Sequence, residues 1–316
     1  MTETLRVGVV GVGYLGRFHA KIYSELPGVE LVGVADVDAA RAQSVAAEYG
    51  TRALTDPAEL LGQIDAVSIV VPTRQHLAVA RPFLEAGVHM LLEKPIAHTT
   101  DDGEAICALA EQAGVVLQIG HVERYNAGVM ALAGQVQRPR FIEAHRIGGF
   151  PARATDVDVV TDLMIHDIDI ILSLVPAPIA SVSAVGLPVL TEHFDIANAR
   201  LEFADGCVAN VTASRVSQQT LRRIRIFELH SFAALDFVEQ KVDVVRAQPV
   251  AGQVYPEIER RAVEVVPRKP LDAELADFAA RVRDGRPPLV DGRAGLEALR
   301  VAQLINRRMA EWQAAQ

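Results

Sequence analysis

The chain has 316 residues, half of them hydrophobic, and its 40 acidic residues outnumber 31 basic ones to give a net charge of −9 at pH 7. This composition excludes a disordered or low-complexity protein, and an acidic chain without a Lys/Arg run is not expected to bind nucleic acid. The length favours two domains, and because Cys107 and Cys207 lie in apolar contexts and no signal-peptide pattern opens the sequence, we expect a cytoplasmic protein.

The first 120 residues alternate short β-branched runs with helical patterns. We predict strands at 5–12, 29–36, 66–72, 88–95 and 114–121, and helices ending near residue 26 and spanning 38–49, 75–87 and 101–113. Strands that alternate with helices in this way form a parallel sheet with right-handed crossovers. Residues 1–121 are therefore expected to form one α/β domain.

Three glycines follow the first predicted strand with the spacing G-x-G-x-x-G, at Gly11, Gly13 and Gly16. In a dinucleotide site the first glycine allows a tight turn, the second lets the backbone approach the pyrophosphate, and the third lets helix and strand pack closely. The helix N-terminus, here Tyr14 and Leu15, supplies N–H groups to the phosphates. The motif predicts a Rossmann fold with a bound dinucleotide.

Asp36 ends the next predicted strand, where an acidic side chain accepts hydrogen bonds from the adenosine ribose. A carboxylate there repels a 2′-phosphate, so the expected cofactor is NAD. Arg41 lies near enough to leave NADP as an alternative. The alternative to a dinucleotide site is a tight turn that needs glycine, followed by an aspartate that has no role in cofactor binding.

Polar residues also follow the next two strands of this domain. Ligands bind at the carboxyl ends of parallel strands, so we expect cofactor contacts there. These candidates are Pro72, Thr73, His76, Glu93 and Lys94. Burial would lower the pKa of the Lys94 ammonium toward the range of proton transfer. The alternative is a surface lysine that ends a strand.

After residue 121 the pattern changes to one helix at about 156–175 and then strands within 181–187, 196–216, 224–237 and 243–250. The turn Ala204-Asp205-Gly206 predicts a hairpin, and successive hairpins predict a large open, mostly antiparallel sheet with the helix on one face. Helices at 271–284 and 291–313 close the chain. Residues 170–190 carry no charge, but three prolines interrupt them, so we expect no membrane span.

The helix at 156–175 carries acidic residues in an apolar segment without Lys or Arg. On an α-helix Asp162, His166 and Asp169 fall within one stripe about 60° wide, which predicts a buried helix that borders a polar pocket. One alternative is a polar edge packed against another element, with His166 in the core. A metal site is the other, but the stripe lacks an H-E-x-x-H pattern, so we predict acid–base chemistry and no metal.

Together, the glycine motif, Asp36, Glu93-Lys94-Pro95 and Asp162-x-x-x-His166 resemble the glucose-fructose oxidoreductase / inositol dehydrogenase / MocA family of sugar dehydrogenases. The resemblance implies a second α/β domain at 122–316 that binds substrate and forms homodimers or homotetramers through its sheet, with the nicotinamide between the domains. It also implies that Lys94, Asp162 and His166 are catalytic. His166 would remove the hydroxyl proton, Lys94 would stabilise charge on the oxygen, and Asp162 would orient the imidazole or bind a neighbouring hydroxyl.

Segments 118–126, 161–172 and 213–227 resemble the subgroup that oxidises the C3 hydroxyl of UDP-N-acetylglucosamine during lipid A synthesis. This implies that the substrate contacts the three catalytic residues and, in addition, Arg124, Tyr125, Asn126 and Arg153. Arg124, Arg153, Arg215 and Arg222 are candidates to bind the diphosphate. Alternatives are a dehydrogenase of a free sugar or inositol, a non-catalytic NAD-binding regulator, and an enzyme whose bound NAD cycles during elimination or hydrolysis of a glycoside.

Overall fold

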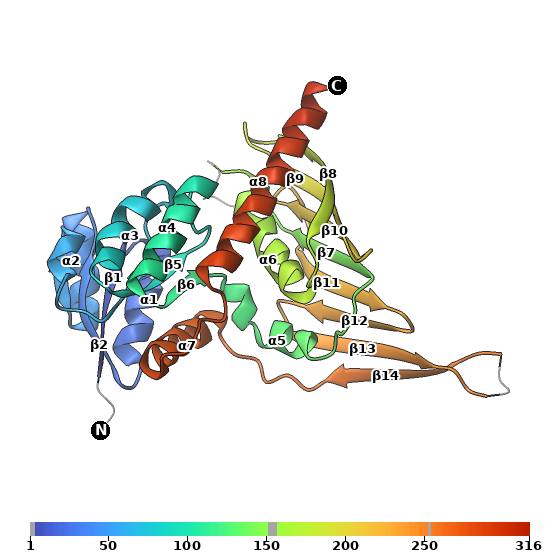
Figure 1. Ribbon diagram of the computed structural model, residues 1–316, viewed down its shortest axis with the longest axis horizontal. Helices are drawn as coiled ribbons and strands as arrows, with labels where there is room; N and C mark the ends of the chain where they lie inside the picture. The colour runs from blue at the N-terminus through green and yellow to red at the C-terminus, as the bar shows by residue number, and fades with distance from the viewer. Residues whose placement is uncertain (1–3, 151–156, 252–253) are drawn as a thin grey trace. The chain divides into compact units, whose positions relative to one another are not determined.

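The computed structural model describes residues 4–150, 157–251 and 254–316 (Figure 1). It confirms the predicted fold class, with a six-stranded parallel sheet and an eight-stranded, mostly antiparallel sheet. Contacts divide the chain into unit 1, Met1–Val122 with Leu271–Leu299, and unit 2, Glu123–Pro270 with Arg300–Gln316. The first closing helix and the start of the second, up to Leu299, thus group with the N-terminal residues, whereas the sequence suggested a single division after residue 121.

Unit 1 is a Rossmann fold whose sheet has the strand order β3-β2-β1-β4-β5-β6. Its strands are β1 (Leu5–Val10), β2 (Val29–Ala35), β3 (Arg52–Leu54), β4 (Ala66–Ile69), β5 (His89–Glu93) and β6 (Leu117–Gly120). Its helices are α1 (Tyr14–Glu25), α2 (Ala39–Tyr49), η1 (Pro57–Leu60), η2 (Thr73–Gln75), α3 (His76–Glu85), α4 (Thr100–Ala113) and α7 (Pro270–Asp284). Strand order reverses between β1 and β4, so their carboxyl ends flank the switch point where such folds bind ligands.

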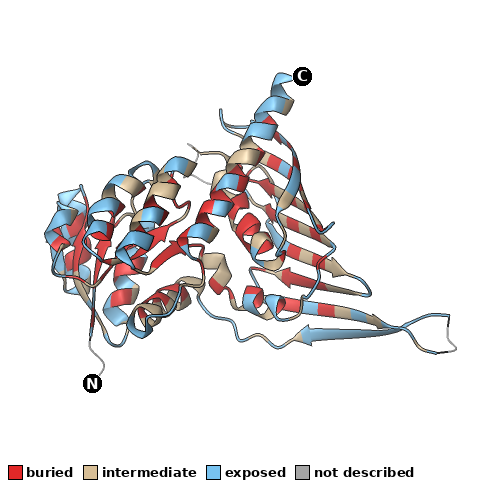
Figure 2. Cartoon of the chain, viewed as in Figure 1, coloured by how far each residue is buried: buried red, intermediate tan, exposed pale blue. Residues whose placement is uncertain are grey.

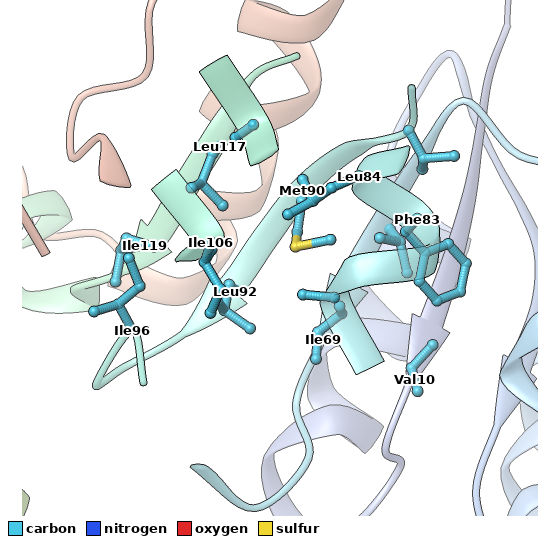
Figure 3. Packing of buried hydrophobic residues seen from close by; sticks show 14 of the residues in the cluster. Val10, Ile69, Phe83, Leu84, Met90, Leu92, Ile96, Ile106, Leu117 and Ile119 are labelled. Carbon is cyan, nitrogen blue, oxygen red and sulfur yellow. The ribbon is translucent and has the colours of Figure 1, made fainter. Parts of the chain in front are cut away.

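Both faces of this sheet are buried, which explains why its strands are continuous apolar runs. On one face Phe83 of α3 and Ile106 of α4 pack against Met90 and Leu92 of β5, as Figure 3 shows. On the other face α1, α2 and α7 cover β1, β2 and β5. Strand β3 was not predicted, because three residues are too few to show a period.

Unit 2 is built on a sheet with the order β14-β13-β12-β11-β7-β10-β9-β8. Its strands are β7 (Phe141–Ile147), β8 (Ile179–Leu187), β9 (Ile196–Phe203), β10 (Val208–Ser214), β11 (Leu221–Glu228), β12 (Ser231–Asp236), β13 (Lys241–Gln248) and β14 (Glu257–Val263). All neighbours are antiparallel except β7 and β10, which run parallel. The predicted hairpin is confirmed, with Glu202 of β9 opposite Val208 of β10.

Burial alternates along the central strands of this sheet (Figure 2). In β7, Ile142, Ala144 and Arg146 are buried on the face that α6 (Ile165–Leu174) contacts. The opposite face carries the stacked rings of Phe141 and Phe227, 5.8 Å apart. The sequence therefore anticipated correctly that one helix covers one face of the sheet.

The remaining helices are η3 (Val122–Tyr125), α5 (Ala127–Ala133), η4 (Val160–Met164) and α8 (Gly292–Ala314). Residues 170–190 form the end of α6, a turn and β8, as the sequence predicted. Within the described residues, no helix combines the length and apolarity needed to cross a membrane.

The helix predicted at 156–175 is wrong in its first part. Residues 151–156 lie outside the described residues, and Val160–Met164 form a π-helix that leads into α6. A π-turn bonds residue i to i+5 and inserts an extra residue per turn, so it changes the direction of side chains relative to an α-helix. Asp162 lies in this turn, and its angular relation to His166 therefore differs from the 100° spacing that the sequence analysis assumed.

Candidate active site

The glycine loop after β1 requires glycine at two of its three motif positions. Gly11 has a φ of +84°, and a Cβ there would lie 2.6 Å from the Val70 carbonyl oxygen. A Cβ on Gly16 would lie 1.8 Å from the Gly11 carbonyl oxygen, so only glycine lets α1 approach the strand this closely. A Cβ on Gly13 would meet no atom within 4 Å. The space beside Gly13 is where the motif places a pyrophosphate.

Helix α1 also lacks a side-chain cap, because Gly13 occupies the N-cap position. Asp38 caps α2 and Thr99 caps α4, whereas α3 of the same unit, like α1, has no side-chain cap. The N–H groups of an uncapped first turn, together with the helix dipole, form an anion site. Tyr14 and Leu15 occupy this turn and are exposed.

A cavity of about 410 Å³ opens beside the glycine loop at the carboxyl ends of the strands. Among the predicted cofactor residues it is lined by Gly11, Gly13, Asp36 and Pro72. Most of the remaining wall is apolar, with Val37, Pro57, Val70, Val71 and Val79, and the polar side chains of Arg41, Thr55 and Gln75 also line it. A largely apolar pocket with an acidic group beside Arg41 fits an adenosine, so these residues are suited to hold the adenylate half of NAD.

Asp36 is buried at the end of β2 and fixed by several donors. Its carboxylate accepts hydrogen bonds from the Val12 and Asp38 backbone N–H groups, each at 2.9 Å. The Arg41 guanidinium contacts the same carboxylate at 3.1 and 3.2 Å and also pairs with Asp38. Arg41 therefore stands beside Asp36 as the sequence anticipated.

The residues after β4 occupy two kinds of environment. Pro72 and Thr73 are exposed to partly exposed at the start of η2. His76 is buried, and its Nδ1 and Nε2 lie 3.2 and 3.0 Å from the carbonyl oxygens of Ile96 and Val71. Burial lowers the pKa of His76. Its ring thus joins two backbone loops, which differs from the cofactor contact expected from its position in the sequence.

Glu93 and Lys94 lie at the carboxyl end of β5. Glu93 is buried and its Oε2 accepts a hydrogen bond from the Lys94 N–H at 3.2 Å. Lys94 itself is partly buried, as expected for a lysine that follows an apolar strand. The Glu93 carboxylate rests against Gly120 of β6, where a Cβ would lie 2.9 Å from the carboxylate carbon.

In unit 2 the four ionisable residues on α6 and the preceding π-helix separate into two groups. Asp162 and His166 are partly exposed, whereas Asp167 and Asp169 are buried. Arg124 Nη1 donates to Asp169 Oδ1 at 3.4 Å. Asp169 therefore packs against another element, which was the alternative interpretation of the polar stripe. No group of three or more His, Cys, Asp or Glu residues suited to a metal occurs in the described part of the chain.

Asp167 is held by Arg146, a residue that the sequence analysis missed. Arg146 Nε and Nη2 donate to the two Asp167 oxygens at 2.8 and 3.0 Å, and Nη1 donates to Glu123 at 2.7 Å. The guanidinium also lies 4.9 Å from the centre of the Phe237 ring. A single arginine in an alternating apolar strand was the available signal, because such a residue is buried only when it is paired.

The residues predicted to bind substrate at 124–126 have structural contacts of their own. Asn126 is buried and caps α5, accepting from the Gly128 N–H at 2.9 Å and donating to the Phe237 carbonyl at 3.1 Å. Tyr125 is also buried. This places Asn126 as a helix cap, which differs from the substrate contact that the resemblance implied. Arg124 keeps part of its surface exposed beside Asp169.

The arginines proposed for the diphosphate also differ. Arg215 is buried, pairs with Asp195 at 2.7 Å and donates to the Val157 carbonyl at 2.8 Å, so it stabilises the approach to the π-helix and is not accessible to a substrate. Arg222 is exposed and lies opposite Arg146 in the β7/β11 pair, on the α6 side of the sheet. Arg153 lies outside the described residues.

Comparison with known protein families matches two parts of the chain. Residues 5–121 match the oxidoreductase family with an NAD-binding Rossmann fold, and residues 129–228 match the GFO/IDH/MocA C-terminal domain. The first match corresponds to the glycine loop, Asp36 and Lys94, and the second to most of the eight-stranded sheet and α6.

Individual relatives cover nearly the whole chain. UDP-N-acetylglucosamine 3-dehydrogenase of Acidithiobacillus ferrooxidans is 40% identical over 300 residues, which is 94% of this chain and 95% of the relative. A solved structure of that protein has a TM-score of 0.90 at 39% identity, covering 96% of this chain and 97% of its own. The NAD-dependent scyllo-inositol 2-dehydrogenase of Bacillus subtilis is 30% identical over 311 residues, with coverages of 92% and 90%.

More distant structures share the fold. Levoglucosan dehydrogenase, solved in complex with NADH and levoglucosan, has a TM-score of 0.85 at 18% identity and covers 97% of both chains. The fold is thus retained where most of the sequence has changed.

Proposed function

Because the chain belongs to the GFO/IDH/MocA oxidoreductase family and is an NAD-dependent dehydrogenase acting on CH-OH groups, we propose that it oxidises the C3 hydroxyl of UDP-N-acetylglucosamine to the 3-keto sugar. The observation that carries this proposal is the 40% identity, over 94% of the chain, to a UDP-N-acetylglucosamine 3-dehydrogenase. The ketone is the group that an aminotransferase converts to an amine, which fits a role in lipid A biosynthesis.

The proposed catalytic groups are Lys94 on unit 1 and Asp162 and His166 on unit 2. His166 is partly exposed, so its imidazole can reach a substrate and accept the hydroxyl proton. The Lys94 ammonium would donate to the substrate oxygen and stabilise its developing charge. Asp162 would orient the imidazole or bind a neighbouring hydroxyl. The chemistry that NAD supplies when bound is acceptance of the hydride from the sugar carbon.

The binding roles are also proposals. Residues 1–121 would bind NAD, with the amides at Gly13, Tyr14 and Leu15 on the pyrophosphate and Asp36 on the ribose. Residues 122–316 would bind the sugar nucleotide, with Arg124 and Arg222 meeting the diphosphate because both retain exposed surface near α6. The sheet face that carries Phe141 and Phe227 would pair copies of the chain as a dimer or tetramer.

The test is a direct assay with purified protein, NAD and UDP-N-acetylglucosamine, following NADH absorbance. We expect turnover with a product that has lost one H₂ and whose ketone reacts with hydroxylamine. N-acetylglucosamine without UDP and UDP-glucose without the acetamido group serve as controls, and each should react more slowly. Absence of turnover with UDP-N-acetylglucosamine, in protein shown to bind NAD, would contradict the proposed substrate.

A dehydrogenase of a free inositol is the second candidate, and it is supported by the 30% identity to scyllo-inositol 2-dehydrogenase over 92% of the chain. Including scyllo-inositol and myo-inositol in the same assay separates the two candidates. An inositol carries no phosphate, so replacing Arg222 with Met should leave its kcat/KM unchanged while lowering that of a UDP-sugar.

A further inference from the structure

A series of buried polar side chains crosses the interior of unit 1 and ends at Glu93. Tyr23 Oη lies 3.0 Å from Ser68 Oγ, and Ser68 Oγ lies 3.2 Å from His19 Nδ1. On the other side of the ring, His19 Nε2 lies 3.3 Å from Glu93 Oε1. Tyr23, Ser68 and His19 are all completely buried. The series therefore links α1, β4 and β5, and it ends at Glu93, the residue before Lys94.

These polar groups occupy positions where the fold needs only apolar packing. The buried residues of α1 are Gly16, His19, Ala20 and Tyr23, so two of four inward positions carry polar groups. Burying a hydroxyl or an imidazole is unfavourable unless hydrogen bonds replace those lost to water. Apolar side chains of similar volume would fill this space without that cost, which points to a role beyond packing.

One direction of donation satisfies the links from Tyr23 through Ser68 to His19. Burial raises the pKa of Tyr23, so the phenol stays protonated and can donate to Ser68. Ser68 can then donate to His19 Nδ1, and this selects the imidazole tautomer with its proton on Nε2. His19 Nε2 lies 3.3 Å from Glu93 Oε1, which is within ion-pair distance but outside hydrogen-bond geometry. The ring therefore lies between Ser68 on one side and the Glu93 carboxylate on the other.

We propose that His19 is a positioning residue that fixes the Glu93 carboxylate and, through it, the backbone at Lys94. Three contacts hold the carboxylate, since His19 lies at Oε1, the Lys94 N–H donates to Oε2, and Gly120 supports the carboxylate carbon. Loss of the His19 contact would let the carboxylate rotate and the start of the Lys94 loop move. The inference rests on the proposed role of Lys94 in the reaction.

The test compares two amide substitutions of the same residue. His19→Gln places an amide near the position of Nε2 and keeps a polar group against Glu93, whereas His19→Asn places one near Nδ1 and reaches only Ser68. A displacement of about 1 Å near a reacting group lowers the rate by about 100-fold, so we expect kcat of His19→Asn to fall about 10- to 100-fold. His19→Gln should stay within about threefold of the parent, and the NAD dissociation constant should change little in both.

A second measurement needs neither substrate nor turnover. Acetic anhydride labels lysines according to their exposure and basicity, and mass spectrometry gives the rate at Lys94 relative to the exposed Lys21 and Lys241. We expect His19→Asn to raise the relative labelling of Lys94 and His19→Gln to leave it unchanged. If the parent protein does not oxidise UDP-N-acetylglucosamine, the proposed substrate fails, but this labelling still decides whether His19 positions Lys94.

Tyr23→Phe is the matched control, because it removes a buried hydroxyl of the same series that does not touch Glu93. It should lower the thermal midpoint while keeping kcat and Lys94 labelling. The inference is overturned if His19→Asn leaves both readouts unchanged, or if Tyr23→Phe alters them as much. Should His19→Asn not fold, Glu93→Gln replaces it, and unchanged Lys94 labelling in that folded variant would overturn the inference equally.

Discussion

Arg146 donates two hydrogen bonds to Asp167, at 2.8 and 3.0 Å, and both side chains are buried in unit 2. Asp167 is adjacent to His166 on α6. The ion pair between Arg146 and Asp167 therefore fixes the buried side of the helix, while His166 remains partly exposed. The acidic residues of this apolar helix therefore have different roles. Asp167 and Asp169 anchor the helix to arginines, and Asp162 and His166 are the two residues for which we propose a role in the chemistry.

Replacing Arg146 with Met should destabilise the protein strongly, because Asp167 would become a buried carboxylate without its partner. Breaking one side of a buried ion pair costs about 3–5 kcal/mol. The double variant Arg146→Met/Asp167→Leu should recover part of this loss, since apolar pairs of similar volume often replace a buried ion pair without cost. Chemical denaturation of the parent, both single variants and the double variant measures the coupling, expected at about 0.5–3 kcal/mol. Additive single effects would show that the pair does not anchor α6.

Replacing His166 with Asn should lower the chemical step by about 10²–10⁴-fold, because Asn cannot accept the hydroxyl proton. The NAD dissociation constant should stay nearly unchanged, since the proposed NAD site lies on unit 1. Single-turnover absorbance measures the first quantity and NADH fluorescence titration the second. Equal losses in both would mean that His166 serves the structure of the helix.

The sequence predicted the parts of the site that depend on local rules. A G-x-G-x-x-G motif fixes backbone conformation and close approach within a few residues, so Gly11, Gly13 and Gly16 lie as expected. The partner of Asp167 could not be predicted from the sequence. Arg146 lies on β7, and the position of this strand in the sheet depends on long-range pairing, as with β11. The π-turn at Val160–Met164 was also missed, since periodicity arguments assume 100° per residue.

The same limit applies to residues whose type suggested a ligand. Arg215 and Asn126 belong to residue types that bind phosphates and sugars, yet their side chains serve Asp195 and the α5 cap. Which polar groups an interior needs is decided by the packing of distant segments. A single sequence shows the type of each residue, but it does not show which distant groups its side chain will contact.

Gly13→Ala and Gly16→Ala make a matched pair that separates binding from folding. Gly13→Ala adds a methyl group to open space, so the protein should fold with an unchanged thermal midpoint and bind NAD at least about tenfold more weakly, a loss of about 1.4 kcal/mol. Gly16→Ala adds a Cβ 1.8 Å from the Gly11 carbonyl oxygen and should destabilise unit 1 itself. Circular dichroism and NADH fluorescence distinguish the two results. Normal NAD affinity in folded Gly13→Ala would place the pyrophosphate elsewhere.

Asp36→Ser should shift the cofactor preference toward NADP. It removes the carboxylate that would repel a 2′-phosphate and leaves Arg41 beside the cavity to attract it. We expect the ratio of kcat/KM for NADP to that for NAD to rise about tenfold or more, equal to at least about 1.4 kcal/mol. Asp38→Asn is the control, because it removes an exposed charge that contacts Arg41 outside the cavity lining. An equal shift in the control would assign the effect to the charge of Arg41 alone.

Asp195→Asn should remove a component of stability that depends on pH. Burial by itself would raise the pKa of Asp195, but three backbone N–H groups at 189–191 and the Arg215 guanidinium hold it well below its ordinary value. A carboxyl with a depressed pKa stabilises the folded state fully above its unfolded pKa of about 3.9, and this contribution is lost as the pH falls toward the folded value. Loss of a buried pair worth about 3 kcal/mol lowers the thermal midpoint by about 6–12 °C at pH 7. The difference between parent and variant should shrink below about pH 4, whereas Asp205→Asn, in the exposed β9/β10 turn, should show no such trend. A difference that stays constant down to pH 2 would mean that Asp195 stabilises the turn through its shape and not through its charge.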